Sequence, residues 1–470
     1  MKTTIQIVTG ALCLAASAYA QQAALLSAAS FTGPSTPPGA SATYGADFAR
    51  GRVIVAIDNT LRFLGPTPSG WSMTSTIIAA PTSDVAGFAS WIRGDGASVV
   101  VGCQSGHVFM YDAKSDFSMP IASWRNPAGM RATILSVQGN RILVGTPTTD
   151  GTPGGGYLLV RNGSAFDVEQ SFVSSDNTWE LGFSGGLSGD DVVLSGEGSA
   201  SFWHAKAWRQ SSGTWVSLGY LSPVGAGGNP IFGCSSSVED GVLAIGARDD
   251  ANLGWQSGAC FIFERTPSGW TQSAKIVLNE PPYNNQEMGG SVAVHGGRVW
   301  ITAGGNMENG TGDRGRILVV GKTNGNWELE QVLRAPDSGF PTFWGYSPKF
   351  GPNGMMVTFG ADSPTPFSAW RVRVDAFAPF QDCNENGVSD ASDVLAGASS
   401  DVESNGVPDE CECIADVSGD GIVQGADLGL ILANWGPTFG HRLPADVNAD
   451  DQVDGVDLGI VLQNWGTCSN

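Results

Sequence analysis

The chain has 470 residues, a length that can bury a large core and that predicts two or more domains. Glycine is abundant at 65 residues, while charged residues make up only 15% and aromatic residues 9%, which favours a turn-rich all-β protein over a helical or disordered one. The net charge of −21 is uneven, because the segment from Asp382 onward holds 17 acidic residues and one basic residue, Arg442. A phosphate backbone needs a basic surface, so this charge argues against nucleic acid as a partner and calls for cations.

The first twenty residues have the pattern of a secretory signal. Lys2 precedes an apolar run from about Ile5 to Ala16, and Ala18-Tyr19-Ala20 follows as a small-residue cleavage site. Residues 1–20 are therefore expected to be removed and to stay outside the fold, and the protein is expected to be secreted or held at the cell surface. No later stretch is apolar over the roughly 20 residues that a membrane-spanning helix needs.

One pattern recurs between residue 22 and about residue 379. Each copy has a Gly-led strand, a β-branched strand that ends in Gly, an aromatic strand and one more strand. The copies begin at 44–57, 87–102, 130–145, 182–196, 232–247, 288–304 and 344–361. Third strands are expected at 106–112, 155–163, 258–270 and 315–327, and the last strand of four copies opens with Trp71, Trp215, Trp270 or Trp327.

Units of roughly 40–58 residues with four short strands each predict an all-β fold with a seven-bladed β-propeller, here over residues 21–379. A lone four-stranded sheet exposes both apolar faces, and blades that stack around an axis bury them. The ring must also close. The last copy ends at 369–377 and lacks an outer strand, which residues 23–31 can supply. Two packed sheets of eight strands each are the alternative.

The fifth and sixth copies resemble the FG-GAP propeller repeat of integrin α-subunits and many exported bacterial proteins. FGCSSSVEDGVLAIGA (232–247), MGGSVAVHGGRVWITAG (288–304) and GACFIFER (258–265) carry this resemblance. Some FG-GAP families hold calcium in an acidic loop of the blade. Residues 247–254 and 306–315 lack the spacing of that loop, so no calcium is expected in the propeller.

The propeller has no motif that defines a catalytic site. Its histidines and the tail histidine form no metal-binding pair, which favours structural roles for His107, His204, His295 and His441. Two loop carboxylates could form a glycosidase pair, although such groups are usually just solvated; the candidates are Glu197, Asp240, Asp249, Asp250 and Asp313. Tryptophans beside the loops either stack on sugar rings or pack between blades: Trp91, Trp203, Trp208, Trp255 and Trp344.

The acidic tail opens with two runs of oxygen-bearing residues at 382–393 and 401–412. Calcium prefers oxygen donors at alternate positions around a sharp turn at Gly. The first run offers Asp382, Asn384, Asn386, Asp390 and Asp393, and the second offers Asp401, Glu403, Asn405, Asp409 and Glu412. The pair resembles the short calcium repeats of thrombospondin type 3 segments, and two solvated turns are the alternative.

A second pair of loops, 416–427 and 446–457, leads into two matched helices, ADLGLILANWG (426–436) and VDLGIVLQNWG (456–466), in which seven of eleven positions are identical. The expected calcium ligands are Asp416, Ser418, Asp420, the Ile422 carbonyl, Gln424 and Asp427, and then Asp446, Asn448, Asp450, the Gln452 carbonyl, Asp454 and Asp457. In the helices, core positions are expected at Leu428, Ile431, Leu432, Leu458, Val461 and Leu462. Because so small a module has little core, metal binding is expected to supply much of its folding free energy.

Two loop–helix units with Asp at position 12 resemble a type I dockerin over 416–466, within a small α-helical domain at 413–470. The resemblance implies calcium as the cofactor and a cohesin-type partner or cell-surface scaffold. Two features depart from the family pattern. Asp451 stands where a Gly is usual, and Gly425-Ala426 and Gly455-Val456 replace the Ser/Thr-type pair that reads the partner, so partner specificity does not carry over.

An exported chain favours disulfides, and seven cysteines remain after removal of the leader, so one is left over. Cys103 is the expected free, buried thiol. Cys383 and Cys411 stand in the two loops of 382–412, and if such loops cross-link, they pair with each other. Cys413 and Cys468 bracket the duplicated module and are expected to staple its ends.

Three functions fit these observations. The favoured one is a non-catalytic exported protein, whose propeller recognises a glycan or protein and whose calcium-dependent tail docks it, as in polysaccharide-degrading assemblies. The second is a glycoside hydrolase or polysaccharide lyase with a propeller catalytic domain. The third is a structural envelope protein with a calcium-rigidified stalk.

Overall fold

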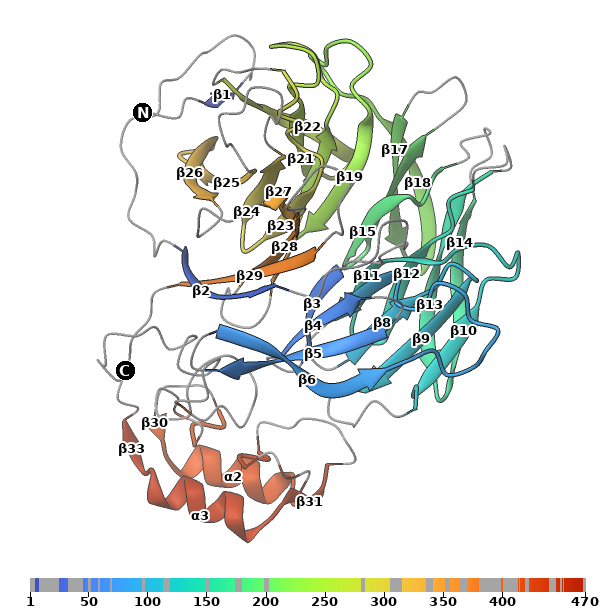
Figure 1. Ribbon diagram of the computed structural model, residues 1–470. Helices are drawn as coiled ribbons and strands as arrows, with labels where there is room; N and C mark the ends of the chain where they lie inside the picture. The colour runs from blue at the N-terminus through green and yellow to red at the C-terminus, as the bar shows by residue number, and fades with distance from the viewer. Residues whose placement is uncertain are drawn as a thin grey trace.

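The computed structural model describes strands over most of the chain and two helices near its end (Figure 1). The described residues are 5–7, 25–32, 45–49, 52–57, 60–67, 70–94, 98–112, 119–148, 153–173, 180–197, 203–279, 284–304, 315–334, 341–350, 356–362, 371–379, 399, 413, 415–418, 422–438, 445–448, 450 and 452–467.

The described strands before residue 380 form seven antiparallel meanders of four strands, one for each predicted copy. The first three are β3 (Gly45–Ala49) to β4 (Arg52–Ile57), β5 (Thr60–Thr67) and β6 (Gly70–Ile78); β7 (Trp91–Gly94) to β8 (Ser98–Gly102), β9 (His107–Asp112) and β10 (Ala122–Arg125); and β11 (Thr133–Gln138) to β12 (Arg141–Gly145), β13 (Gly155–Asn162) and β14 (Ala165–Val173). The next three are β15 (Ser184–Ser188) to β16 (Asp191–Glu197), β17 (Trp203–Ser211) and β18 (Thr214–Leu221); β19 (Phe232–Glu239) to β20 (Val242–Ala247), β21 (Ala259–Thr266) and β22 (Gly269–Leu278); and β23 (Val292–His295) to β24 (Arg298–Ala303), β25 (Arg316–Thr323) and β26 (Asn326–Arg334). The last meander joins β27 (Pro341–Phe350), β28 (Met356–Asp362) and β29 (Arg371–Pro379) to β2 (Leu25–Thr32).

Local sequence explains how each meander forms. The second strands are rich in β-branched residues and are buried along most of their length; β8, SVVVG, is buried at every position. Tight turns use residues that accept positive φ, as at Asp240 (46°) and Gly241 (81°) between β19 and β20. The predicted tryptophans are each the second residue of a last strand, in β6, β18, β22 and β26.

The first strands of the meanders contact one another in a closed circuit that runs β3, β7, β11, β15, β19, β23, β27 and back to β3. Side chains on these strands, or directly before one, bond to the backbone of the next meander: Ser184 Oγ accepts from Ser236 N (2.8 Å), Ser237 Oγ from Val294 N (3.0 Å) and Ser291 Oγ from Ser347 N (3.0 Å). The approach is close enough that a Cβ at Gly145 would lie 1.9 Å from the Gly182 carbonyl oxygen. The described meanders therefore form a radial, propeller-like array.

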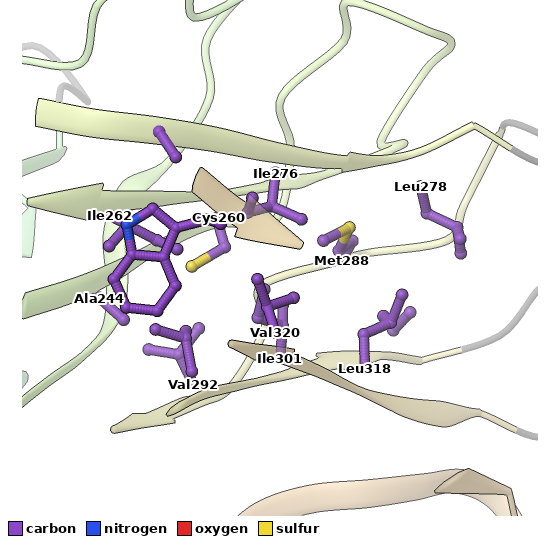
Figure 2. Packing of buried hydrophobic residues seen from close by; sticks show 14 of the residues in the cluster. Ala244, Cys260, Ile262, Ile276, Leu278, Met288, Val292, Ile301, Leu318 and Val320 are labelled. Atoms are coloured by element: carbon purple, nitrogen blue, oxygen red, sulfur yellow. The ribbon is translucent and has the colours of Figure 1, made fainter. Parts of the chain in front are cut away.

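Apolar clusters fill the space between successive meanders. Figure 2 shows one of them, in which Ile262 and Ile276 of the fifth meander face Ile301 and Leu318 of the sixth. Trp327 closes this cluster and is only 3% exposed, while its indole N–H donates to Glu264 Oε1 at 3.0 Å. Fully burying one such side chain stabilises the fold by about 1.5–3 kcal/mol, so each interface contributes strongly.

The alternative of two packed eight-stranded sheets is wrong, because the apolar faces pack from one meander to the next around the circuit. One eight-stranded sheet does occur among the described strands. It arises because β10 and β14 share a single parallel bridge, Ser123 to Ala165, which joins the outer edges of the second and third meanders.

An N-terminal strand completes the last meander, as predicted. β2 pairs antiparallel with β29, from Leu25 opposite Pro379 to Thr32 opposite Arg373. A further strand, β1 (Ile5–Ile7), pairs with the edge strand β22. This differs from the expectation that the first twenty residues stay outside the fold. Leader cleavage stays a prediction, and a chain cleaved after Ala20 would lack β1 and leave β22 as the edge.

Candidate functional site

The C-terminal module is built from two copies, and a short strand in the loop of each copy pairs with a short strand of the other copy. α2 (Gly425–Ala433) and α3 (Gly455–Gln463) lie side by side (Figure 1). β30 (Ile422–Val423), in the first loop, pairs with β33 (Gly466–Thr467) after the second helix, and β32 (Gln452–Val453), in the second loop, pairs with β31 (Gly436–Pro437) after the first. Because each loop is bonded to the opposite copy, the two copies are held as one unit.

Both helices are shorter than predicted. They end at Ala433 and Gln463, and the following asparagines, Asn434 and Asn464, are the C-caps. The chain then turns at Gly436 (φ 125°) and Gly466 (φ 136°), a conformation that side-chain-bearing residues rarely adopt. The helices were predicted too long because the apolar spacing of the sequence continues past the residues at which the backbone leaves the helical conformation.

The position-12 carboxylates organise both loops from inside. Asp427 and Asp457 are fully buried. Asp427 accepts hydrogen bonds from Ser418 N (2.8 Å) and Gln424 N (2.7 Å). Asp457 accepts from Val447 N (2.7 Å), Asn448 N (3.2 Å) and Asp454 N (2.8 Å). Burial alone would raise the pKa of Asp427, but the backbone donors hold that pKa below its ordinary value.

The other described loop residues supply oxygen atoms of the kind that calcium prefers. Asp450 N donates to Asp446 Oδ1 at 3.0 Å, which curls positions 1 and 5 of the second loop toward each other. In the first loop, Ser418 Oγ donates to Asp416 Oδ1 at 3.1 Å. Within the described part of the chain no three acidic, histidine or cysteine side chains converge on a metal position. Asp420, Gly421 and Asp451 lie outside that part, so the donor chemistry fits calcium while the full ligand set stays a prediction.

The two earlier loops, 382–393 and 401–412, lie outside the described residues, and so do Cys383, Cys411, Cys468 and His441. Their ligand sets and the Cys383–Cys411 pair therefore stay predictions.

The described cysteines differ from the expectation of one leftover thiol. Cys103 is free and buried, as predicted, but Cys234 and Cys260 are free as well. Burial raises the pKa of Cys234 to about 11, so this thiol stays protonated at neutral pH. Cys413 is disulfide-bonded, and since the other described cysteines are free, its partner lies outside the described residues.

Peptide mapping without reduction is expected to join Cys413 to Cys468, because these cysteines bracket the module whose ends β30 and β33 bring together. Mass spectrometry of the intact chain before and after alkylation should count Cys103, Cys234 and Cys260 as free thiols. A Cys411–Cys413 or Cys383–Cys413 peptide would contradict this pairing.

The helices expose apolar side chains that were expected in the core. Ile431 and Val461 are buried, as predicted, and Leu428 and Leu458 pack against them. The prediction is wrong for Leu432 and Leu462, which are 60% and 54% exposed, and the tryptophans that follow, Trp435 and Trp465, are 51% and 52% exposed. We call these four residues (Leu432, Trp435, Leu462 and Trp465) the tail apolar set. Their equivalence in the two copies follows from the duplication.

A cavity of about 410 Å³ lies where the first strands of the meanders meet. Its walls come from β7, β11, β15, β19, β23 and β27, or from residues just before them. Three cationic side chains reach it, Arg93, Arg131 and Lys349, among serine and threonine residues. No sequence motif predicted these three cations, because each of them stands at a different position within its own copy of the repeat.

The other predicted propeller residues have structural contacts. His107 stacks on Phe109, His295 bonds Glu239 (3.2 Å), and His204 lies against Tyr220. Among the candidate carboxylates, Asp250 is paired with Lys275, and Asp249 Oδ1 lies 3.6 Å from Arg248 Nε. Asp240 lies in the tight turn between β19 and β20, and Asp313 and the Glu197 side chain lie outside the described residues. Trp208 packs on Phe172, Trp255 is 64% exposed, and Trp91 lines the cavity, while the side chains of Trp203 and Trp344 are outside the described set.

Neither helix in the described part of the chain is long and apolar enough to cross a membrane. No family model and no curated protein matches the chain. Its fold is similar to that of solved structures of low identity. One is a crystal structure of the mitotic checkpoint complex, with 13% identity, 79% of this chain and 97% of that chain covered, and a TM-score of 0.49. Another is the WD40 β-propeller domain of Doa1, with 12% identity, 75% and 97% coverage, and a TM-score of 0.45.

Proposed function

We propose that the chain is an exported, non-catalytic binding protein: a seven-bladed propeller that recognises a glycan or protein and a calcium-dependent, dockerin-like tail that docks it to a cohesin-type partner. The observation that carries the docking role is the tail apolar set. Each of its four side chains is more than half exposed, although the module has few apolar residues to bury. Exposed Leu and Trp at equivalent places in two copies are typical of a surface that a protein partner covers.

Calcium is proposed to stabilise that surface. Bound calcium would supply the positive charge that the acidic loops lack. The carboxylates that would hold the ion are those of Asp416, Asp427, Asp446, Asp450 and Asp457. Two of these carboxylates, Asp427 and Asp457, also accept hydrogen bonds from the loop backbone and lie in the first turns of the helices. The helices that carry Leu432 and Leu462, and the segments just after them that carry Trp435 and Trp465, therefore depend on the loops, which gives a physical reason for docking to require the metal.

Substitution within the tail apolar set is expected to weaken docking. With Leu432 and Trp435 both changed to serine in the full chain, affinity for a recombinant cohesin-type domain should fall at least tenfold, because large apolar anchors dominate such interfaces. Calorimetry with calcium and with a chelator measures this. Val224→Ser, at a propeller residue that is 72% exposed, is the matched control and should bind as the parent does.

Equal binding by both variants, or binding unaffected by chelation, would rule out this docking mode. No contact in the described residues favours the hydrolase or lyase alternative. One of the candidate carboxylates, Asp250, is already committed to an ion pair with Lys275. Failure of every cohesin-type domain to bind, with calcium uptake intact, would leave the structural envelope role as the better explanation.

A further inference from the structure

The central cavity carries an excess of positive charge when Lys349 is protonated. Arg93, Arg131 and Lys349 line it. Among the described residues, the carboxylates near them are Asp47, which acts on Arg93 and Lys349, and Glu180, whose Oε1 lies 3.9 Å from Arg131 Nη2. A low-dielectric wall strengthens the field of the uncompensated charge.

Arg131 is the least satisfied of the three cations. Its Nε and Nη2 atoms are buried and make no hydrogen bond, although a guanidinium has five donors. In the described part of the chain, the guanidinium also lies over the ring of Phe183, 6.0 Å from its centroid, and Phe183 is 41% exposed. Buried donors without acceptors are costly, so this guanidinium is suited to a ligand that supplies acceptors.

Arg93 on β7 and Lys349 on β27 line the same cavity from either side of β3 in the circuit. Arg93 donates to two main-chain carbonyls, Ile92 O (2.8 Å) and Leu135 O (3.4 Å). Burial, and after it the positive charge of Arg93, lowers the pKa of Lys349 to about 7, and Asp47 offsets this only in part. Burial is therefore the main reason why this lysine loses its proton near neutral pH, and the charge of Arg93 adds to it.

The remaining walls offer hydroxyl groups. Thr133, Ser136, Ser184, Ser235 and Ser291 line the cavity beside the cations. A hydroxyl can both donate to and accept from a ligand, and about 410 Å³ is in the range of small-molecule sites. Arg93 donates to the carbonyl of Leu135 on β11, and Arg131 lies two residues before β11, so both arginines line the cavity beside this strand. A ligand of small-molecule size can bridge them.

We propose that this central cavity binds a small molecule that carries an oxoanion (a carboxylate, sulfate or phosphate), with Arg131 and Arg93 as the anion-binding residues and Lys349 as a third cation. The site is independent of the tail and of docking. Bidentate donors on Arg match the planar carboxylate and the tetrahedral oxoanions alike.

Binding is coupled to proton uptake. An anion in the cavity favours the charged form of Lys349 and so raises its pKa, whereas Arg93 on β7 opposes and Asp47 on β3 supports that form. Cys234, which also lines the cavity, remains a thiol over this pH range because its pKa is about 11. Affinity should therefore fall as pH rises through 7, by roughly tenfold between pH 6 and pH 8.

Calorimetry on the full chain tests the site with sulfate, inorganic phosphate and citrate as separate probes. Sulfate has no proton to exchange between pH 6 and 8, so its pH dependence reports the protein. Saturable binding of at least one probe is expected, with affinity reduced at least tenfold in Arg131→Ala and less in Arg131→Lys. Arg161→Ala, which removes an exposed arginine that bonds Gly163 O, is the matched control and should bind normally.

Lys349→Met provides a second, independent readout, because it should abolish the pH dependence of sulfate binding while some affinity persists. It also keeps the test valid if Arg131→Ala fails to fold. The proposal is overturned if none of the probes saturates, or if Arg131→Ala and Lys349→Met bind sulfate with the parent's affinity and pH profile. Which probe binds most tightly distinguishes carboxylate from sulfate and phosphate ligands.

Discussion

Lys275→Ala is expected to destabilise the propeller by roughly 3–5 kcal/mol, the range for breaking one side of a buried ion pair. Lys275 Nζ lies 2.9 Å from both carboxylate oxygens of Asp250 and 2.7 Å from Gly225 O. The two side chains are 2% and 0% exposed. Without the ammonium group, the Asp250 charge is left buried with only the backbone donors of Gly227 and Asn252.

Urea unfolding followed by tryptophan fluorescence measures this loss. Lys322→Ala is the control, since Lys322 pairs with Glu264 at 2.8 Å but is 38% exposed, and such pairs contribute about 1 kcal/mol or less. Adding Asp250→Asn to Lys275→Met should recover part of the stability, because the uncompensated charge is then gone. A Lys275→Ala midpoint equal to that of Lys322→Ala would show that the pair is hydrated or dispensable.

Asp457→Ala is expected to unfold the C-terminal module while leaving the propeller folded. The change leaves three backbone donors, at Val447, Asn448 and Asp454, without their acceptor inside the module. An unsatisfied buried donor costs about 1–3 kcal/mol, and the small core of this module cannot offset three of them. The variant also lacks the position-12 carboxylate that calcium would use.

Hydrogen exchange with mass spectrometry separates the two parts of the chain. Protection should vanish across α2 and α3 in Asp457→Ala, with and without calcium, and stay unchanged in β19–β22. Gln463→Ala, at an exposed residue of α3, should keep the parent's protection. Retained protection of α3 in Asp457→Ala would mean that the carboxylate does not organise the loop.

Sequence periodicity predicted the meanders well because each copy repeats the same local physics: a β-branched strand that must be buried, bounded by turn residues. Even the closing strand was predictable, since the last copy lacked a partner that residues 25–32 supply. Leu432 and Leu462 were misplaced because their spacing from Leu428 and Leu458 is helical whether or not another element covers them. Arg93, Arg131 and Lys349 could not be found, since the ring, not the chain order, brings them together.

The pairing of β2 with β29 makes the order of synthesis run against the order of assembly. Residues 25–32 leave the ribosome early, yet the strand that they pair with follows roughly 340 residues later, a separation that makes closure a late folding event. A nascent chain must keep this apolar segment unpaired until residue 371 has emerged. A permuted chain that begins at β3 and carries residues 25–32 after Pro379 would form the same sheet through a local hairpin.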